Sequence, residues 1–193
     1  MKSIAVYCGS SAGKRAIYTE VAKEMGGLLA KRNMRLVYGG GKVGLMGVVA
    51  DAVMDAGGEV IGVIPGFLNH KEIGHTGVTE LHVVESMHER KMLMFNESDG
   101  FIAMPGGFGT MDELFEILTW AQLGLHPKPI GILNVEGYYN PFIQHVNHMM
   151  EEGFLKPIYR NMLLEAETPE ALLEAMEAYV APDVKPWLKP SAT

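Results

Sequence analysis

The chain has 193 residues, of which 48% are hydrophobic and 20% are charged, the balance of a globular protein and not of a disordered one. This length favours one compact domain over two small ones. The formal net charge of -7 leaves no broad basic surface for nucleic acid, although a local basic pocket can still bind a small anion.

The sequence also limits the expected compartment. No apolar run approaches the roughly eighteen residues of a membrane-spanning helix, and residues 1–3 lead into a strand-like segment without the features of a signal peptide. Cys8 is the single cysteine, which excludes an internal disulfide and suits a reducing compartment. Its place at the end of an apolar run favours a buried residue over a nucleophile. We expect a cytoplasmic protein that binds neither membranes nor nucleic acid.

Short apolar runs alternate with longer segments of helical period along the chain. The runs that predict strands are 3–8, 34–39, 59–64, 80–85, 100–105 and 129–134. The segments that predict helices are about 15–32, 44–57, 87–98 and 111–123, followed by a mostly helical C-terminal part. Within that part, Thr168 and Pro169 are a suitable N-cap and first residue of a helix.

Strands that alternate with helices of about ten to fifteen residues are typical of βαβ units with right-handed crossovers. We therefore expect an α/β fold of the Rossmann-like, doubly wound type, with a parallel sheet of about six or seven strands and helices on both faces. Residues 1–181 are expected to form one domain, and residues 182–193, with three prolines, a C-terminal tail. In such a sheet, ligands bind at the carboxyl ends of the strands.

The motif PGGFGTMDE, residues 105–113, follows a predicted strand and opens a predicted helix. Its glycines let the backbone fold closely around a ligand, and the N–H groups and dipole of a helix start favour an anion such as phosphate. As an alternative, Thr110 and Glu113 form a T-x-x-E capping box. Capping would explain these two residues but not three glycines within four positions.

The segment SMHERKM, residues 86–92, places two cations in the second turn of a predicted helix that Ser86 and Glu89 would cap. The fork of Arg90 suits a phosphate, and Lys91 supplies a point charge. The alternative is a solvated surface pair, which is the usual role of adjacent arginine and lysine.

The segment GGGKVGLMG, residues 39–47, matches the G-x-G-x-x-G dinucleotide pattern. The acidic ribose partner of an NAD site would have to be Glu59, which begins its strand instead of ending it. This favours a nucleotide-cradling loop over an NAD site, with close packing of helix on strand as the alternative. Elsewhere, His145 and His148 lack a third ligand with metal spacing, so no metal site is expected.

The SMHERK and PGGFGTMDE motifs, together with GSS at 9–11 and GGG-x-x-GLMG at 39–47, resemble the Lonely Guy (LOG) family. That family comprises the cytokinin riboside 5′-monophosphate phosphoribohydrolases and bacterial relatives, some of them AMP nucleosidases. The similarity extends from Ile4 to about Tyr179. Similar sequences have carried the label "possible lysine decarboxylase", but nothing in this sequence indicates a pyridoxal phosphate site.

The resemblance implies hydrolysis of the N-glycosidic bond of adenosine 5′-monophosphate, or of an N6-modified derivative, by a homodimer with no metal or organic cofactor. It implies that Arg90 and Glu113 are the catalytic pair. The expected substrate-binding residues are Gly9, Ser10, Gly40, Gly41, Glu72, Lys91, Gly106, Gly107, Phe108, Gly109, Thr110, Met111, Asp112 and Thr119.

Breaking this bond builds positive charge on the ribose and negative charge on the leaving base. Glu113 is expected to stabilise that cation or activate the attacking water, while the glycines and the helix start hold the 5′-phosphate. Arg90 stays protonated, so its expected role is electrostatic, on the phosphate or on the base.

Other classes of protein compete with this hypothesis. A nucleotide- or cofactor-binding protein without hydrolysis would keep the glycine loops but need not keep Arg90 with Glu113. An NAD-dependent oxidoreductase is disfavoured because the third strand lacks an acidic residue at its end. A purely structural interaction protein would leave the clustering of glycine loops at one sheet edge unexplained.

Overall fold

The computed structural model describes residues 1–72 and 74–184, and the side chains of residues 70–72 lie outside that description. Its described strands form one parallel sheet in the order β4-β3-β2-β1-β5-β6-β7. The strands are β1 (Ser3–Tyr7), β2 (Arg35–Tyr38), β3 (Val60–Pro65), β4 (Glu80–Val84), β5 (Gly100–Ala103), β6 (Ile130–Leu133) and β7 (Leu163–Ala166). The first six match the predicted strands, and the predicted doubly wound α/β class is confirmed.

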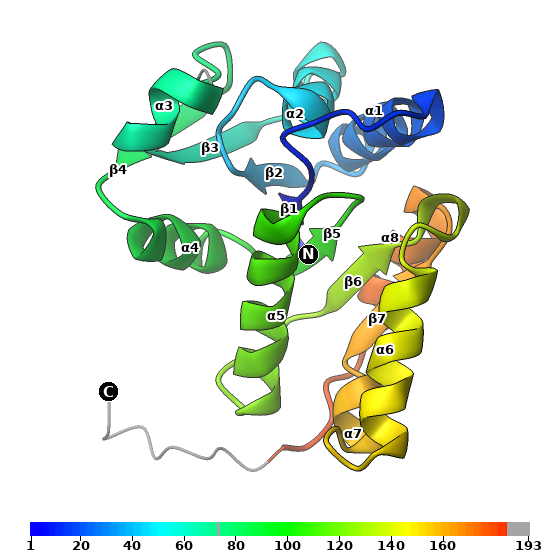
Figure 1. The fold of residues 1–193 in the computed structure, drawn as a ribbon. Helices are drawn as coiled ribbons and strands as arrows, with labels where there is room; N and C mark the ends of the chain where they lie inside the picture. The colour runs from blue at the N-terminus through cyan, green and yellow to red at the C-terminus, as the bar shows by residue number, and fades with distance from the viewer. Residues whose placement is uncertain (73, 185–193) are drawn as a thin grey trace.

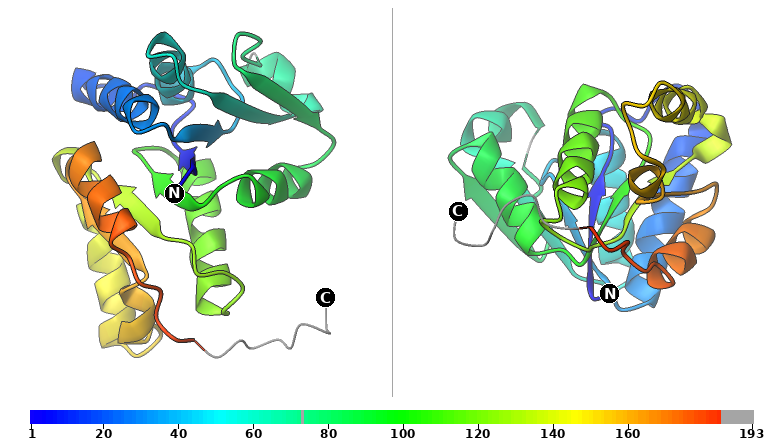
Figure 2. Two further views of the ribbon diagram at one scale, coloured as in Figure 1. Left: turned by 180° about the vertical axis from the view of Figure 1, so that it is seen from behind. Right: turned by 90° about the horizontal axis from the view of Figure 1, so that it is seen from below.

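Helices cover both faces of this sheet (Figures 1 and 2). They are α1 (Ala16–Lys31), α2 (Gly44–Asp55), α3 (Gly66–Glu72), α4 (Met87–Asn96), α5 (Phe108–Gln122), the 3₁₀ turn η1 (Val135–Gly137), α6 (Asn140–Glu151), α7 (Pro157–Arg160) and α8 (Pro169–Glu177). Apolar side chains of α1, α2 and α8 form the core on one face, and those of α4, α5 and α6 form the core on the other. The burial of both faces explains why the central strands are almost continuously apolar.

The structure corrects the sequence-based prediction in three places. The segment LLEA of β7 consists of good helix formers, but pairing with β6 at the sheet edge makes it a strand. Helix α3 lies in a stretch that has no clear helical period. Helix α5 begins at Phe108, about one turn before the predicted start, because the glycine-rich motif itself forms the first turn. At the C-terminal helix, the Ala171 N–H donates to Thr168 Oγ1 at 3.4 Å, which confirms the predicted cap.

The strand order creates a switch point between β1 and β5. The chain runs outward from β1 to β4 and then returns to place β5 on the other side of β1. The loops that leave the two central strands are joined there, because the Gly9 N–H donates to the Pro105 carbonyl at 3.0 Å. The start of α2 is attached to the same place, since the Leu45 N–H donates to the Gly9 carbonyl at 3.0 Å. In doubly wound sheets, the carboxyl edge at such a point is where ligands bind.

Within the described residues, no helix is long and apolar enough to cross a membrane. Near the end of the chain, Pro182 and Val184 line a small cavity with the C-terminal end of α5. Residues 185–193, which make up most of the predicted tail, lie outside the described residues. The boundaries 1–181 and 182–193 therefore stay predictions.

Candidate active site

A cavity of about 200 Å³ lies at the carboxyl ends of β1, β2 and β5, where α4 and α5 approach the sheet. Its lining combines two glycine loops, the first turns of α5 and the inner face of α4. The lining residues are Val6, Tyr7, Cys8, Gly9, Ser10, Gly39, Met46, Met87, Arg90, Gly107, Phe108, Gly109, Thr110, Asp112 and Glu113.

The first turn of α5 points its backbone donors at this cavity. Gly107 is the N-cap and has no side chain with which to satisfy the N–H groups of Phe108 and Gly109, which in a helix have no internal acceptor. Thr110 lies inside the helix, so the predicted T-x-x-E capping box is wrong. A Cβ added at Gly107 or Gly109 would meet no atom within 4 Å, so both glycines face open space in which an anion can sit.

Helix α4 turns one of its two predicted cations inward. The predicted cap by Ser86 is confirmed, because the Glu89 N–H donates to Ser86 Oγ at 3.1 Å. The Glu89 carboxylate accepts from the Glu85 N–H at 2.9 Å and not from the Ser86 N–H that a full capping box would use. Arg90 is only 6% exposed, so the interpretation of this residue as a solvated surface charge is wrong. The Arg90 guanidinium instead becomes part of the cavity wall.

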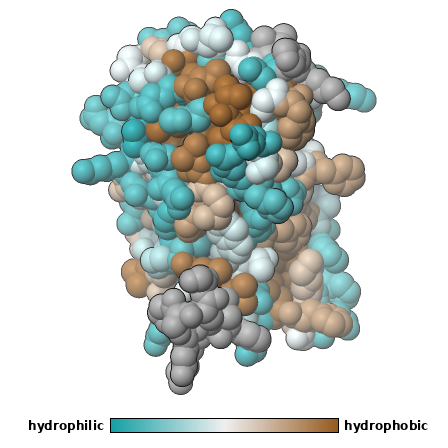
Figure 3. Space-filling view, turned by 90° about the vertical axis from the view of Figure 1, so that its left-hand side faces the viewer, coloured by the Kyte–Doolittle hydropathy of each residue, from teal (hydrophilic) through white to brown (hydrophobic). Residues whose placement is uncertain are grey.

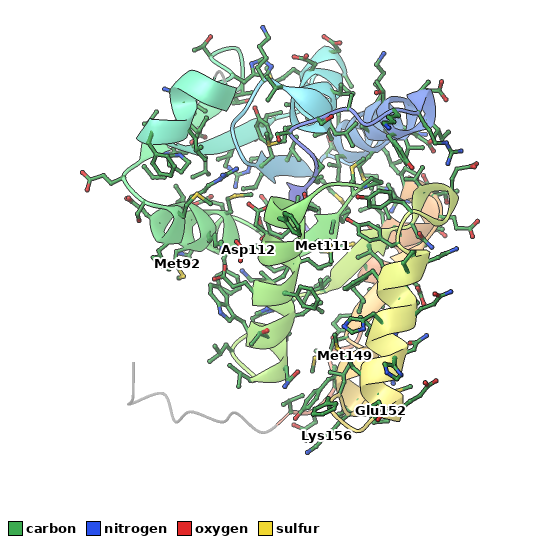
Figure 4. All side chains as sticks on the ribbon, viewed as in Figure 1. Met92, Met111, Asp112, Met149, Glu152 and Lys156 are labelled. Atoms are coloured by element: carbon green, nitrogen blue, oxygen red, sulfur yellow. The ribbon has the colours of Figure 1, made fainter. Side chains whose placement is uncertain are left out.

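Lys91 points in a different direction. Its Nζ lies 2.8 Å from Asp112 Oδ2 and 3.5 Å from Glu116 Oε2, so Lys91 joins α4 to α5. Figure 4 shows Asp112 on the side of α5 that faces α4 and Met111 on the opposite side. Lys91 is not among the residues that line the cavity.

The glycine after β2 makes room for Arg90. Arg90 Nη2 donates to the Gly39 carbonyl at 3.2 Å, and a Cβ added at Gly39 would lie 2.0 Å from that nitrogen. Arg90 Nε is buried and has no hydrogen-bond partner within the described chain. A buried donor left in this way costs about 1–3 kcal/mol, so the site favours a ligand that brings an acceptor.

The pKa of Tyr7 depends on the charged groups around the cavity. Burial is the main cause that raises the pKa of its phenol, and the carboxylates of Glu113 and Glu116 raise it further, while Arg90 lowers it. Glu113 and Arg90 therefore act on the same phenol, which places an acidic and a basic group at one cavity. Burial, together with Glu113, also raises the pKa of Cys8, so this thiol stays protonated and is the buried residue that we predicted.

The structure gathers nine of the predicted site residues around the cavity: Gly9, Ser10, Arg90, Gly107, Phe108, Gly109, Thr110, Asp112 and Glu113. It places other predicted residues elsewhere. Gly106 packs behind the loop, where an added Cβ would lie 2.1 Å from Thr110 Oγ1. Gly40 has a φ of +75° that favours glycine, and Gly41 pairs with Gly74.

Two further predicted contacts lie away from the cavity, and a third cannot be placed. Met111 packs partly buried against the core. Thr119 lines a separate apolar groove between α5 and α6, where Met149 of α6 also lies (Figure 4). The Thr119 hydroxyl donates to the Phe115 carbonyl at 2.7 Å. The side chain of Glu72 lies outside the described residues.

Sequence reasoning missed several lining residues. Tyr7 lies in a predicted strand, and Met46 and Met87 lie within the motifs 39–47 and 86–92, but none of the three is among the predicted site residues. The available signal was their position, within a motif for the two methionines and two residues before Gly9 for Tyr7. Gly39 was noted only as a match to the dinucleotide pattern, whereas its contact in the structure is with a side chain 51 positions later.

The described residues do not fit two other kinds of site, a pyridoxal phosphate site and a metal site. No lysine is among the described residues that line the cavity, so this site lacks the side chain that forms a Schiff base with pyridoxal phosphate. In the part of the chain that the structure describes, no group of three or more histidine, cysteine or acidic side chains is placed to hold a metal ion.

The sequence of this chain is similar to a set of plant enzymes. The probable cytokinin riboside 5′-monophosphate phosphoribohydrolase LOGL2 of Oryza sativa subsp. japonica is 51% identical over 178 residues, which cover 92% of this chain and 73% of the rice protein. The cytokinin riboside 5′-monophosphate phosphoribohydrolase LOG1 of Arabidopsis thaliana is 49% identical over 179 residues, which cover 93% of this chain and 84% of that protein.

Solved structures share the fold at lower identity. The molybdenum cofactor binding protein from Rippkaea orientalis is 22% identical, with a TM-score of 0.69, over 92% of this chain and 96% of that chain. The Moco carrier protein from Chlamydomonas reinhardtii is 20% identical, with a TM-score of 0.68, over 91% and 95% of the two chains. At these identities the likeness is one of fold alone.

Residues 46–176 also match a family model that is described as "Possible lysine decarboxylase". That span contains the PGGFGTMDE motif, the SMHERK motif and most of the cavity lining. From this match and from the identity of about half to the plant enzymes, the chain belongs to the Lonely Guy (LOG) family of phosphoribohydrolases.

Proposed function

We propose that this protein hydrolyses the N-glycosidic bond of adenosine 5′-monophosphate, or of an N6-substituted derivative, and releases the free base and ribose 5-phosphate. The observation that carries this proposal is the cavity in which buried Arg90, Glu113 and the open first turn of α5 come together. Relatives that are about half identical to this chain are named as phosphoribohydrolases of this kind, which supports the same reaction.

The 5′-phosphate is assigned to the first turn of α5. The open space at Gly107 and Gly109 has room for its oxygens, and the N–H groups of that turn supply donors aligned with the helix dipole. Because the phosphate does not react, its binding energy serves to position the ribose at the reacting carbon.

The bond cleavage is assigned to Glu113 and Arg90. A water oxygen forms a bond to C1′ of the ribose as the bond from C1′ to the base nitrogen breaks, and the electron pair of that bond leaves with the base. Glu113 accepts the proton of the water or stabilises the positive charge on the ribose. The leaving base then takes up a proton. Arg90 stabilises the negative charge of the nucleotide or of the leaving base. Its buried Nε–H can donate a hydrogen bond to an oxygen or nitrogen of the ligand.

The base is assigned to the mouth of the cavity. A volume of about 200 Å³ is small compared with usual ligand pockets of about 300–1,000 Å³, so it holds only part of a nucleotide. Phe108 lines this mouth and is 97% exposed as a residue, so an aromatic base can lie against its ring.

The test is to incubate the purified protein with adenosine 5′-monophosphate and, separately, with its N6-isopentenyl derivative, and to follow the products by chromatography. We expect free base and ribose 5-phosphate in equal amounts, and the ratio of the two rates defines the substrate preference. Tight binding without release of base from either nucleotide would contradict the proposal and favour a carrier. Binding of NAD would favour an oxidoreductase.

We also propose that the protein acts as a homodimer in the cytoplasm. Exposed apolar side chains support an interface: Phe67, Val83 and Met92 belong to α3, β4 and α4, which lie on one side of the molecule. Figure 3 views that side and shows an apolar patch among hydrophilic residues. Light scattering should give twice the monomer mass, and a monomeric mass would contradict the dimer.

The proposed cytoplasmic location is supported by the single cysteine, which is buried and suits a reducing compartment.

A further inference from the structure

The glycine loop after β5 is held from behind by hydrogen bonds to its carbonyl groups. The carbonyl oxygens of residues 104–106 each accept a bond from a different donor: the Tyr139 hydroxyl at 2.7 Å, the Gly9 N–H at 3.0 Å and the Tyr138 hydroxyl at 2.5 Å. Two of these donors are adjacent tyrosines that follow η1, and neither tyrosine is among the residues that line the cavity. The arrangement fixes the orientation of successive peptide groups.

Only one of the two tyrosine bonds aims a donor at the cavity. In a trans peptide the C=O and N–H groups point in opposite directions. The Gly106 carbonyl points to Tyr138, so the N–H of Gly107 points away from it, and Gly107 lines the cavity. The carbonyl that Tyr139 holds is joined to Pro105, which has no N–H.

The chain is built to hold Tyr138 in this place. Glu136 and Gly137 both have left-handed backbone conformations, with φ values of +50° and +73°. Such a conformation is costly for glutamate. The Glu136 side chain forms an ion pair of 2.8 Å with Arg15, which joins this turn to the start of α1. The ring of Tyr18 packs edge-on against Tyr138, with 5.8 Å between the ring centroids. Helix α1 and the loop before it therefore support the tyrosine.

We propose that Tyr138 is a positioning residue for the phosphate subsite: its hydroxyl holds the Gly106 carbonyl so that the Gly107 N–H stays directed at the anion. The identity of that anion as the 5′-phosphate of a nucleotide rests on the proposed function. Without the hydroxyl, the peptide can rotate, and part of the phosphate affinity is lost while the reacting groups stay in place.

The test compares Tyr138→Phe with the wild type in two assays. One measures kcat and KM for adenosine 5′-monophosphate, and the other measures the affinity for ribose 5-phosphate by calorimetry. We expect KM and the Kd of ribose 5-phosphate each to rise about threefold to tenfold, the loss of one neutral hydrogen bond, with kcat nearly unchanged. A merely structural role would lower the Tm without this separation of KM from kcat.

Two variants serve as references. Tyr179→Phe removes a half-buried hydroxyl far from the loop and should change neither assay. Tyr139→Phe should lower the Tm, because it leaves a buried carbonyl without its donor, and should weaken ribose 5-phosphate binding less than Tyr138→Phe does. If Tyr138→Phe does not fold, Arg15→Gln weakens the same support from outside, and a smaller rise in the same Kd is expected.

The outcomes separate the two proposals. The positioning role would be overturned if folded Tyr138→Phe protein bound ribose 5-phosphate as tightly as the wild type does. If Tyr138→Phe does not fold, the same result for folded Arg15→Gln protein would overturn it. A wild-type protein that releases no base would overturn the proposed function. In that case, a weaker affinity for ribose 5-phosphate in the variant would still support Tyr138 as the residue that orients the loop.

Discussion

The two ends of the sheet carry hollows of different size and different chemistry. At the amino ends of the strands, Lys2, Ser3, Arg35 and Glu59 are among the residues that line a cavity of about 490 Å³. At the carboxyl ends, the cavity that contains Arg90 measures about 200 Å³. The smaller of the two holds the groups on which the proposed chemistry depends.

Several polar groups at the amino-end cavity pair with other groups of the protein. Arg35 Nε donates to Ser3 Oγ at 3.2 Å, and its guanidinium lies 3.7 Å from Glu97. Asp99 accepts bonds from the backbone N–H groups of Lys2 and Ser3 at 2.6 and 3.1 Å. At the carboxyl end, by contrast, a buried Arg90 N–H lacks a partner among the described residues and the first turn of α5 is open. A buried N–H without a partner among the described residues, and not the larger volume, therefore marks the carboxyl end as the place for a ligand.

The largest expected effect tests the acidic group of the carboxyl-end cavity. Glu113→Gln keeps the size of the side chain but removes its charge, so kcat for adenosine 5′-monophosphate should fall about 10²–10⁴-fold with little change in Tm. Glu59→Gln in the amino-end cavity is the matched control and should leave kcat unchanged. Full hydrolysis by Glu113→Gln would show that the carboxylate is not required.

The next effect tests the basic group. Arg90→Ala should raise KM and lower kcat, because the guanidinium is assigned both to binding and to charge stabilisation, and the affinity for ribose 5-phosphate should fall about tenfold to a hundredfold. Arg35→Ala removes an arginine from the amino-end cavity and should affect stability alone. Equal kinetic losses in the two variants would remove the distinction between the ends.

A smaller effect is expected when Arg90 is displaced instead of removed. Gly39→Ala puts a Cβ 2.0 Å from Arg90 Nη2, which the flexible side chain can avoid by moving, so the fold should survive while kcat/KM falls about tenfold. Gly27→Ala in α1 is the control, since a Cβ there meets no atom within 4 Å and should stabilise the helix by about 0.5–1 kcal/mol. Unchanged kinetics for Gly39→Ala would contradict the assigned role of Arg90 geometry.

The smallest effect belongs to the amino end and concerns stability. Backbone donors, first that of Lys2 and then that of Ser3, lower the pKa of Asp99 against the opposing effect of burial. A carboxyl with a lowered pKa in the folded state stabilises the protein above its unfolded pKa of about 4, and this contribution is lost as pH falls through the folded pKa. Asp99→Asn should therefore lower the Tm by about 2–4 °C or less at pH 7, and the difference should close under acidic conditions. A constant difference across this range would argue against the ionised carboxylate, and kcat should not change.

Sequence patterns predicted the fold well because local runs and periods of apolar residues specify most of its helices and strands. The first six strands and four of the helices have clear apolar patterns, whereas β7 depends on a partner strand and α3 on its surroundings. The carboxyl-edge site followed from the strand order together with the glycine motifs.

Side-chain directions within the site could not be predicted in the same way. Arg90 and Lys91 are neighbours in sequence, but successive residues on a helix point about 100° apart, so only Arg90 reaches the cavity. The support of the loop by Tyr138 joins residues 32 positions apart, and no local pattern marks it beyond two aromatic residues after a glycine.

The most direct measurement is a crystal structure of the Glu113→Gln protein with adenosine 5′-monophosphate. The phosphate should accept hydrogen bonds from the first turn of α5, with the ribose facing residue 113 and Arg90 in contact with the nucleotide. A nucleotide seated at the amino ends of the strands, with the carboxyl-end cavity unoccupied in the same crystal, would contradict the assignment of the active site.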